Sequence, residues 1–260
     1  MSDNFLERVT AARRADAARR RADGALQLAQ AASRAAGAAR DFTAALSRPG
    51  LSLIAEIKRA SPSVGEIAPG ANPSTLASAY EEGGASAVSV LTEPDHFRGS
   101  LDDLRQARSA CRLPVLRKDF LCEPLHVWEA RAAGADAILL IVAALTQTEL
   151  VSLSDLATDL GMSALIEVHS AAEIDRAVLA GARIVGINTR DLTTLEVDPQ
   201  VVAKLLPHVP DGVLTVGESG VKTRADVEAL EGAGVDAVLV GETVMRAPDP
   251  AAKIRELLGR

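Results

Sequence analysis

The segment LSLIAEIK, residues 51–58, is a short apolar run that ends in two charged residues, Glu56 and Lys58. Continuous Val, Ile, Leu and Ala residues, without strict alternation with polar ones, are typical of strands covered on both faces, as in parallel sheets. Charged groups at the end of such a strand indicate a site, because a buried core does not tolerate them unpaired. Seven further apolar runs follow, at residues 85–92, 114–119, 135–143, 163–169, 184–190, 213–219 and 237–242.

The segments between these runs carry helix-start signals, namely a capping residue with an acid three positions later, or a proline at the first helical position. The signals are Asn72-Pro73, Ser100 with Asp103, Thr146 with Glu149, Ser170 with Glu173, Asp198-Pro199, Thr223 with Asp226, and Asp249-Pro250. Several of the expected helices end in glycine before the next run, at Gly83-Gly84, Gly134, Gly181 and Gly234.

Eight strand-helix units in 260 residues predict a (β/α)8 TIM barrel, for which about 250 residues is typical. In this fold the chemistry lies at the carboxyl ends of the strands. The alternative is an open, doubly wound sheet. Eight even repeats are many for that fold, and no G-x-G-x-x-G follows the first run, so we favour the barrel.

The composition predicts one globular domain, since 48% of the residues are hydrophobic and no apolar stretch reaches membrane-spanning length. The amino terminus, MSDNFLERV, lacks the order of a signal peptide, so we expect a cytoplasmic protein that binds no membrane. Cys111 and Cys122 have no metal-ligand spacing to histidine, and we expect reduced thiols and no metal site.

The first 50 residues differ from the rest in charge, with nine Arg against five acids. The Ala- and Arg-rich stretch from Arg8 to Arg40 is expected to be helical, with breaks near Gly24 and Gly37. A basic helical arm is compatible with nucleic-acid binding, but no aromatic residues interleave the arginines to stack on bases. We therefore expect residues 1–48 to be a helical extension packed on a barrel of residues 49–260, with no nucleic-acid partner.

Charged residues end four of the runs, and these are Glu56 with Lys58, Lys118, Glu167 and Glu218. The chain has only five lysines, and the other three, Lys204, Lys222 and Lys253, fall on expected helices or loops where water solvates them. Taken singly, Lys58 or Lys118 could be a structural residue paired with a carboxylate in a buried ion network. The convergence of two ammonium groups and three carboxylates on one barrel mouth instead favours acid-base chemistry, because burial and mutual charge tune pKa values.

Glycines follow the last two strands, in Gly217-Glu218-Ser219-Gly220 and in Gly241-Glu242. Glycine lets backbone N–H groups approach an anion, and the loops after strands seven and eight are the usual phosphate site of a TIM barrel. The pattern predicts a phosphate group of a small-molecule substrate at this place. Glycines that only make tight turns are the alternative.

Five separated motifs, in order, resemble the indole-3-glycerol phosphate synthase family of tryptophan biosynthesis. They are IAEIKRASPS (54–63), PVLRKDFLCEP (114–124), LIEVH (165–169), GINTRDLTTLEVD (186–198) and GESG (217–220). The resemblance implies ring closure of 1-(2-carboxyphenylamino)-1-deoxyribulose 5-phosphate, with loss of CO2 and water, to indole-3-glycerol phosphate. It also implies a TIM barrel that uses no metal or cofactor.

The resemblance implies roles for the polar residues of the site. Lys118 would protonate the ribulose carbonyl while the aromatic carbon attacks it, and Lys58 would contact the substrate carboxylate and assist later proton transfer. Glu167 would act as base or acid in the dehydration. Glu56 would hold the lysines and the sugar hydroxyls in register, and Asn188 would orient the substrate.

The resemblance also implies substrate contacts. Arg190 would lie beside the anthranilate carboxylate. The implied phosphate contacts are Ser61, Ser219, Gly220 and Gly241, in the loop that also holds Glu242, and the implied apolar contacts to the aromatic ring are Phe97, Phe120 and Leu139.

Two other functions are compatible with this fold. A phosphoribosylanthranilate isomerase-like barrel binds a similar ligand but depends on a Cys and an Asp at strand ends, and Lys58 stands here where the first strand would need the Cys. The other is a non-catalytic barrel that only binds a phosphorylated metabolite, which the retained charged groups disfavour. We expect a monomer or a weak homo-oligomer.

Overall fold

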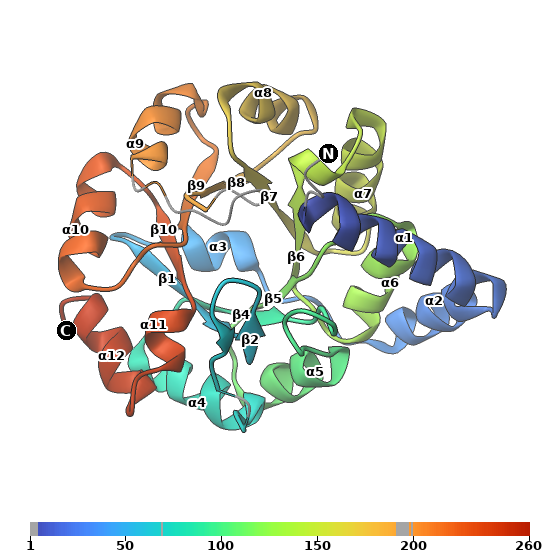
Figure 1. Ribbon diagram of the computed structural model, residues 1–260, viewed down its shortest axis with the longest axis horizontal. Coiled ribbons are helices and arrows are strands. Elements are labelled where there is room, and N and C mark those ends of the chain that lie inside the picture. The colour runs from blue at the N-terminus through green and yellow to red at the C-terminus, as the bar shows by residue number, and fades with distance from the viewer. Residues whose placement is uncertain (1–4, 69, 191–197, 199) are drawn as a thin grey trace.

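The computed structural model describes residues 5–68, 70–190, 198 and 200–260 and forms a closed barrel of parallel strands ringed by helices (Figure 1). The strand order around the barrel is β1-β10-β9-β8-β7-β6-β5-β4, and β1 closes the ring by pairing with both β10 and β4. The predicted (β/α)8 TIM barrel is therefore confirmed, and the open sheet is excluded.

The barrel strands lie inside the eight predicted runs. They are β1 (Ser52–Ile57), β4 (Ala87–Leu91), β5 (Val115–Lys118), β6 (Ala137–Ile141), β7 (Ser163–Val168), β8 (Ile184–Asn188), β9 (Leu214–Glu218) and β10 (Ala237–Val240). After β1 the chain forms a small antiparallel hairpin of β2 (Ala60–Ser61) and β3 (Gly65–Glu66), which the sequence patterns did not predict.

The helices that cover the barrel are α4 (Pro73–Gly83), α5 (Leu101–Ala110), α6 (Pro124–Ala132), α7 (Gln147–Asp159), α8 (Ala171–Leu179), α9 (Val201–Leu205), α10 (Arg224–Ala233), α11 (Glu242–Met245) and α12 (Pro250–Leu257). The expected capping side chains accept a backbone hydrogen bond at the starts of α4, α5, α7, α8, α10 and α12. Because each cap fixes where its helix begins, the caps also fix the lengths of the loops at the barrel mouth.

Three helix starts differ from the prediction. Helix α9 begins at Val201, two residues beyond the expected Asp198-Pro199, and Pro199 lies outside the described residues. The start of helix α6 was not predicted; its N-cap, Glu123, makes no side-chain cap, and Pro124 occupies its first position. Glu242 belongs to the short helix α11 and not to the last strand.

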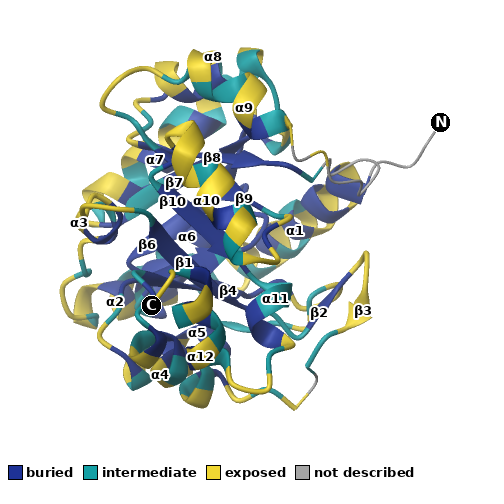
Figure 2. Ribbon diagram, turned by 90° about the vertical axis from the view of Figure 1, so that its left-hand side faces the viewer, coloured by how far each residue is buried: buried dark blue, intermediate teal, exposed yellow. Residues whose placement is uncertain are grey.

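Alternation along the strands divides the core into two shells. Side chains that point outward pack against the helices, and those that point inward, such as Ile54, Leu116 and Leu165, fill the barrel. Helix α3 (Phe42–Leu46) closes the barrel end opposite the mouth, where Phe42 and Leu46 join the interior cluster. Figure 2 shows α3 at one end of the barrel and both α1 and the β2-β3 hairpin at the other.

The amino-terminal segment forms helices α1 (Phe5–Ala22) and α2 (Ala25–Ala35), separated at Gly24, which adopts a left-handed backbone with φ of 81°. Helix α1 packs beside the mouth, where its Phe5 ring meets Phe120 edge to face at 6.1 Å between ring centres. Helix α2 packs mainly on α6. Within the described residues, none of the helices combines the length and the apolar composition needed to cross a membrane.

Candidate active site

The carboxyl ends of the barrel strands bring the predicted charged residues together at the mouth. In strands β1, β5, β7 and β9 an apolar residue that points into the barrel is followed, two positions later, by a charged one, in the pairs Ile54 and Glu56, Leu116 and Lys118, Leu165 and Glu167, and Val216 and Glu218. Because residues two apart in a strand share a face, each charged group lies directly above the apolar interior.

Lys118 is the centre of this cluster. Its Nζ lies 2.5 Å from Glu218 Oε2, 3.8 Å from Glu167 Oε2 and 3.9 Å from Glu56 Oε2. Burial lowers the pKa of Lys118, but the three carboxylates outweigh burial and raise that pKa above its ordinary value. The ammonium is therefore charged, held in place, and available as a proton donor at neutral pH.

Three carboxylates face two lysines, so the cluster has an excess of negative charge. Glu218 is the carboxylate whose pKa is raised most clearly. Burial is the largest effect and raises the pKa of Glu218 to about 7; the charge of Lys118 lowers that pKa, and the charges of Glu167 and Glu56 raise it. The pKa of Glu56 is lowered instead, because Lys58 and Lys118 outweigh the effect of burial. The cluster therefore holds one proton that is easily gained or lost near neutrality.

Glycines leave room for these carboxylates. A Cβ atom on Gly241 would collide with the Glu56 carboxylate, and one on Gly186 would collide with that of Glu218. Lys58 Nζ lies 2.8 Å from Glu56 Oε1, so the second lysine also faces this space. Any larger residue at either glycine would displace the cluster.

Asn188 and Ser219 form a polar corner beside the charged cluster. Asn188 Oδ1 accepts hydrogen bonds from Ser219 Oγ at 2.9 Å and from the Arg190 backbone N–H at 3.0 Å. Ser219 has φ of 68° and Gly220 has φ of 81°, so two consecutive residues adopt the left-handed backbone. This conformation is uncommon for a non-glycine residue, and such strain is concentrated at functional sites.

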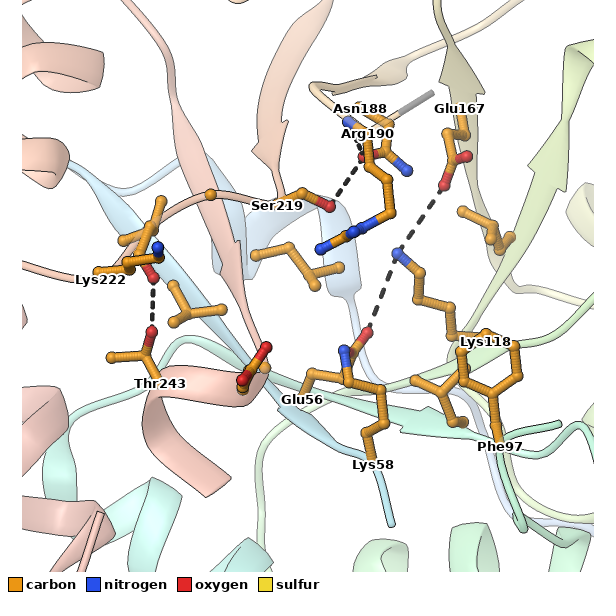
Figure 3. Close-up of a pocket in the computed structure, with 18 of the residues that line it drawn as sticks. Glu56, Lys58, Phe97, Lys118, Glu167, Asn188, Arg190, Ser219, Lys222 and Thr243 are labelled. Atoms are coloured by element: carbon orange, nitrogen blue, oxygen red, sulfur yellow. Dashed lines mark hydrogen bonds and ion pairs between the residues drawn. The ribbon is translucent and has the colours of Figure 1, made fainter. Parts of the chain in front are cut away.

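All of these groups border one cavity of about 760 Å³, which lies within the size range of sites for small molecules. Its lining is apolar near Lys118, where Phe97, Phe120 and Leu139 contribute side chains. Figure 3 shows Phe97 beside the Lys118 stem, whereas Ser219, Lys222 and Thr243 lie on the opposite side of the cavity. The cavity can therefore hold a ligand with one aromatic and one polar end.

The cavity includes most of the predicted site residues, which are Glu56, Lys58, Phe97, Lys118, Phe120, Leu139, Glu167, Asn188, Arg190, Ser219, Gly220, Gly241 and Glu242. Two predicted residues do not border it directly. Glu218 is fully buried behind Lys118, and Ser61 lies in β2, where its hydroxyl is 3.3 Å from that of Ser63. The motif at residues 186–198 is described only to Arg190 and at Asp198.

Four polar residues that were not predicted as site residues lie at the end of the cavity formed by the loops after β9 and β10. Lys222, Asp226, Thr243 and Arg246 border it there. Arg246 Nε lies 2.9 Å from Glu242 Oε1, so the guanidinium offsets a carboxylate that would otherwise repel an anion. The Lys222 side chain is exposed, as the sequence predicts, and it also borders the cavity.

Metal ligands are not gathered at this mouth. Across the part of the chain that the structure describes, no group of three or more His, Cys, Asp or Glu residues is arranged to hold a metal ion. Cys111 and Cys122 are buried and neither borders the cavity. The chemistry that these residues can provide is proton transfer between lysines and carboxylates.

Sequence comparison identifies the family. The profile of a family described as indole-3-glycerol phosphate synthase matches residues 6–257. An indole-3-glycerol phosphate synthase of Mycobacterium avium (strain 104) is 52% identical over 256 residues, which cover 98% of this chain and 93% of that protein. One from Mycobacterium leprae (strain TN) is 51% identical over 253 residues, which cover 97% and 93%.

Comparison with solved structures supports the fold. A 3-hexulose-6-phosphate synthase superposes with a TM-score of 0.64 at 16% identity, covering 80% of this chain and 99% of that chain. A mutant tryptophan synthase α-subunit from Pyrococcus furiosus superposes with a TM-score of 0.60 at 18% identity, covering 80% and 98%. At these identities the likeness concerns the barrel alone.

Proposed function

Because the chain belongs to the indole-3-glycerol phosphate synthase family, we propose that its cavity converts 1-(2-carboxyphenylamino)-1-deoxyribulose 5-phosphate to indole-3-glycerol phosphate, CO2 and water. The family acts in tryptophan biosynthesis. The observation that carries the proposal is the Lys118 ammonium, which three buried carboxylates hold at the junction of the apolar and polar ends of the cavity.

The two ends of the cavity support one orientation of the substrate. Phe97 and Phe120 offer an apolar surface for the aromatic ring, and the backbone amides of Gly220 and Gly241 offer donors for the phosphate. Lys222 adds a positive charge at the phosphate end. The ribulose carbonyl then lies between these ends, where Lys118 stands.

Ring closure places negative charge on the carbonyl oxygen as the aromatic carbon attacks the carbonyl carbon. Lys118 donates a proton to this oxygen, and Glu218, at 2.5 Å from Nζ, fixes the direction of the ammonium. A charged donor that is already in position stabilises the developing oxyanion without reorganisation of water.

Two losses complete the reaction. The carbon-carbon bond to the carboxylate breaks and CO2 leaves, which returns the electron pair to the benzene ring; Lys58 and Arg190 hold the carboxylate until then. The hydroxyl then leaves as water with a proton donated by Lys58, while Glu167 removes a proton from the new ring. The site holds Lys58 and Glu167 on different strands, so that acid and base reach the substrate from different directions.

The reaction is tested by adding the carboxyphenylamino substrate to the purified chain after treatment with a chelator. We expect a fluorescent indole product and one equivalent of CO2 without added metal. Turnover that requires a metal, isomerisation of phosphoribosylanthranilate in its place, or binding without turnover would each contradict the proposal.

The phosphate end is tested with Ser219→Ala. Loss of one hydrogen bond to a charged phosphate weakens substrate binding by about 1.5 to 3 kcal/mol at most, with a smaller change in kcat. The measurement is KM for the substrate together with inhibition by inorganic phosphate. Ser109→Ala, in an exposed part of α5, is the control. Unchanged affinity for both ligands would place the phosphate elsewhere.

A further inference from the structure

His169 follows the end of β7 and lies between two carboxylates, outside the lining of the cavity. Its Nε2 is 3.5 Å from Glu167 Oε1, and its Nδ1 is 3.5 Å from Glu173 Oε2. The backbone N–H of His169 also donates to Glu173 Oε2 at 2.7 Å. Glu173 lies in the first turn of α8, where Ser170 caps the helix. Its carboxylate is therefore fixed in place on the Nδ1 side of the His169 ring, away from Glu167.

The contact between His169 and Glu167 requires a proton. Both Nε2 and Oε1 are buried and have no hydrogen-bond partner among the described residues, because the 3.5 Å contact is too long for a good hydrogen bond. If neither atom carried a proton, the imidazole lone pair would face a carboxylate oxygen. Two buried acceptors that face each other are costly, so one proton lies between them.

The two oxygens of Glu167 have different neighbours. Oε1 faces His169, whereas Oε2 is 3.8 Å from Lys118 Nζ and is turned toward the cavity, as Figure 3 shows. Glu167 is therefore the carboxylate that connects the cavity with the ring behind it. Glu56 and Glu218 also contact the lysines, but no ion pair with His169 is found for either of them in the described part of the chain.

We propose that His169, as an imidazolium backed by Glu173, is a positioning residue that holds the Glu167 carboxylate with Oε2 presented to the substrate. This inference rests on the proposed function, in which Glu167 removes a proton during the dehydration. His169 itself touches no substrate and keeps its own proton through that step.

The charges around His169 support the imidazolium. Those that face the pair from the described elements are Glu167 on β7, Glu173 and Arg176 on α8, Glu218 on β9 and Lys118 on β5. Burial lowers the pKa of His169, but the contact with Glu173 and the charge of Glu167 outweigh burial and raise it. The imidazolium also offsets part of the excess negative charge at the mouth.

The first test compares His169→Leu with His169→Gln in the full-length protein. We expect kcat of the Leu variant to fall by about 10- to 100-fold, as for loss of a residue that orients a reactive group, while product affinity stays within threefold. The pH dependence of kcat should also change, because the charge of His169 is removed from the site. The side-chain amide of Gln can donate a hydrogen bond to Glu167 from the position of Nε2. The Gln variant should therefore keep kcat within about tenfold of the unaltered chain.

Two further variants complete the design. Glu173→Gln keeps an acceptor for the ring but removes its counter-charge, so the basic limb of the profile should move to lower pH. His208→Leu changes a histidine of a surface turn and should leave the profile unchanged. Urea unfolding of each variant shows whether a rate change reflects lost folded protein.

The outcomes separate this inference from the proposed function. Absence of indole product with the unaltered chain would contradict the proposed function. An active unaltered chain together with a His169→Leu variant that keeps its kcat within twofold and its pH profile would contradict the role of His169. A fall in stability with an unchanged profile per folded molecule would also contradict it.

Discussion

Two buried charge clusters meet at β5 and differ in how completely they are paired. Lys118 points into the cavity, whereas its sequence neighbours Arg117 and Asp119 lie in a second cluster between the barrel and α1. Both clusters remove charge from water. Asp119 also borders the cavity, but its carboxylate accepts hydrogen bonds within the second cluster.

In the second cluster the Asp119 carboxylate is fully paired, although Arg13 Nε is buried without a hydrogen-bond partner among the described residues. Asp119 Oδ2 accepts from Arg13 at 2.8 Å, from Arg117 at 3.0 Å and from the Thr92 hydroxyl at 2.7 Å, and Oδ1 accepts the backbone N–H of Phe120. Burial raises the pKa of Asp119, but the two guanidinium groups outweigh burial and lower it. A carboxylate with this set of donors stays ionised and holds α1 against β5.

The cluster at the mouth is incompletely paired. Glu167 Oε1 and Glu218 Oε1 are buried and find no hydrogen-bond partner among the described residues, and the pKa of Glu218 rises to about 7 because burial dominates. A fold that only needed stability would pair or remove these groups. The difference between the carboxylates indicates that the fully paired Asp119 is structural, and that Glu167 and Glu218, each with an unpaired oxygen, are kept for a ligand.

Lys118→Met should have the largest effect. The apolar stem remains but the proton donor is lost, so we expect kcat to fall by roughly 10²- to 10⁴-fold with a much smaller change in KM. Steady-state assays of indole product measure this. Lys204→Met, which removes an exposed lysine of α9, should leave kcat unchanged. Activity within threefold of the unaltered chain would show that Lys118 is also structural.

Asp119→Ala should instead act on stability. It leaves the fully buried Arg117 without its closest anion and Arg13 without its partner, and breaking a buried pair costs about 3 to 5 kcal/mol. Urea unfolding at pH 7 measures the loss. Asp102→Ala removes an exposed partner of Arg105 and should cost less than about 1 kcal/mol. Equal losses from the two variants would contradict a structural role for Asp119.

The sequence was sufficient for the fold because its signals are local. Capping at Ser100, Thr146 and Thr223 and the apolar runs depend on residues within a few positions of each other, and the structure confirms both. The start of α6 was missed because Glu123 makes no side-chain cap. The β2-β3 hairpin was missed because two-residue strands leave no periodicity to recognise.

The site could be predicted only where charge interrupts an apolar run. Lys118 and Glu167 stand out for that reason. Lys222 did not, because an exposed lysine in a loop has the same pattern whether or not it borders a cavity. The pair of Arg13 and Asp119 is separated by 106 positions, so its contact depends on how α1 packs and has no local signature. The roles assigned to the individual site residues stay predictions.

Glu218→Gln gives the smallest effect and the sharpest contrast with Asp119→Ala, because it should stabilise the protein. The pKa of Glu218 is about 7 in the folded chain against an ordinary value of 4.5, so the folded state binds this proton more tightly than the unfolded state. The contribution of Glu218 to stability is therefore fully present below pH 4.5 and is lost as the pH rises through 7.

Glutamine cannot ionise, so the variant escapes that loss. At pH 8 we expect its free energy of unfolding to exceed that of the unaltered chain by about 1 to 3 kcal/mol, and the difference should vanish near pH 4. Urea unfolding across this pH range measures it, with the exposed Glu228→Gln in α10 as the control. A destabilised variant at pH 8 would show that Glu218 is paired as completely as Asp119, and the contrast between the two clusters would not hold. A gain in stability with a loss of kcat would instead mark Glu218 as a charge retained for catalysis at a cost in stability.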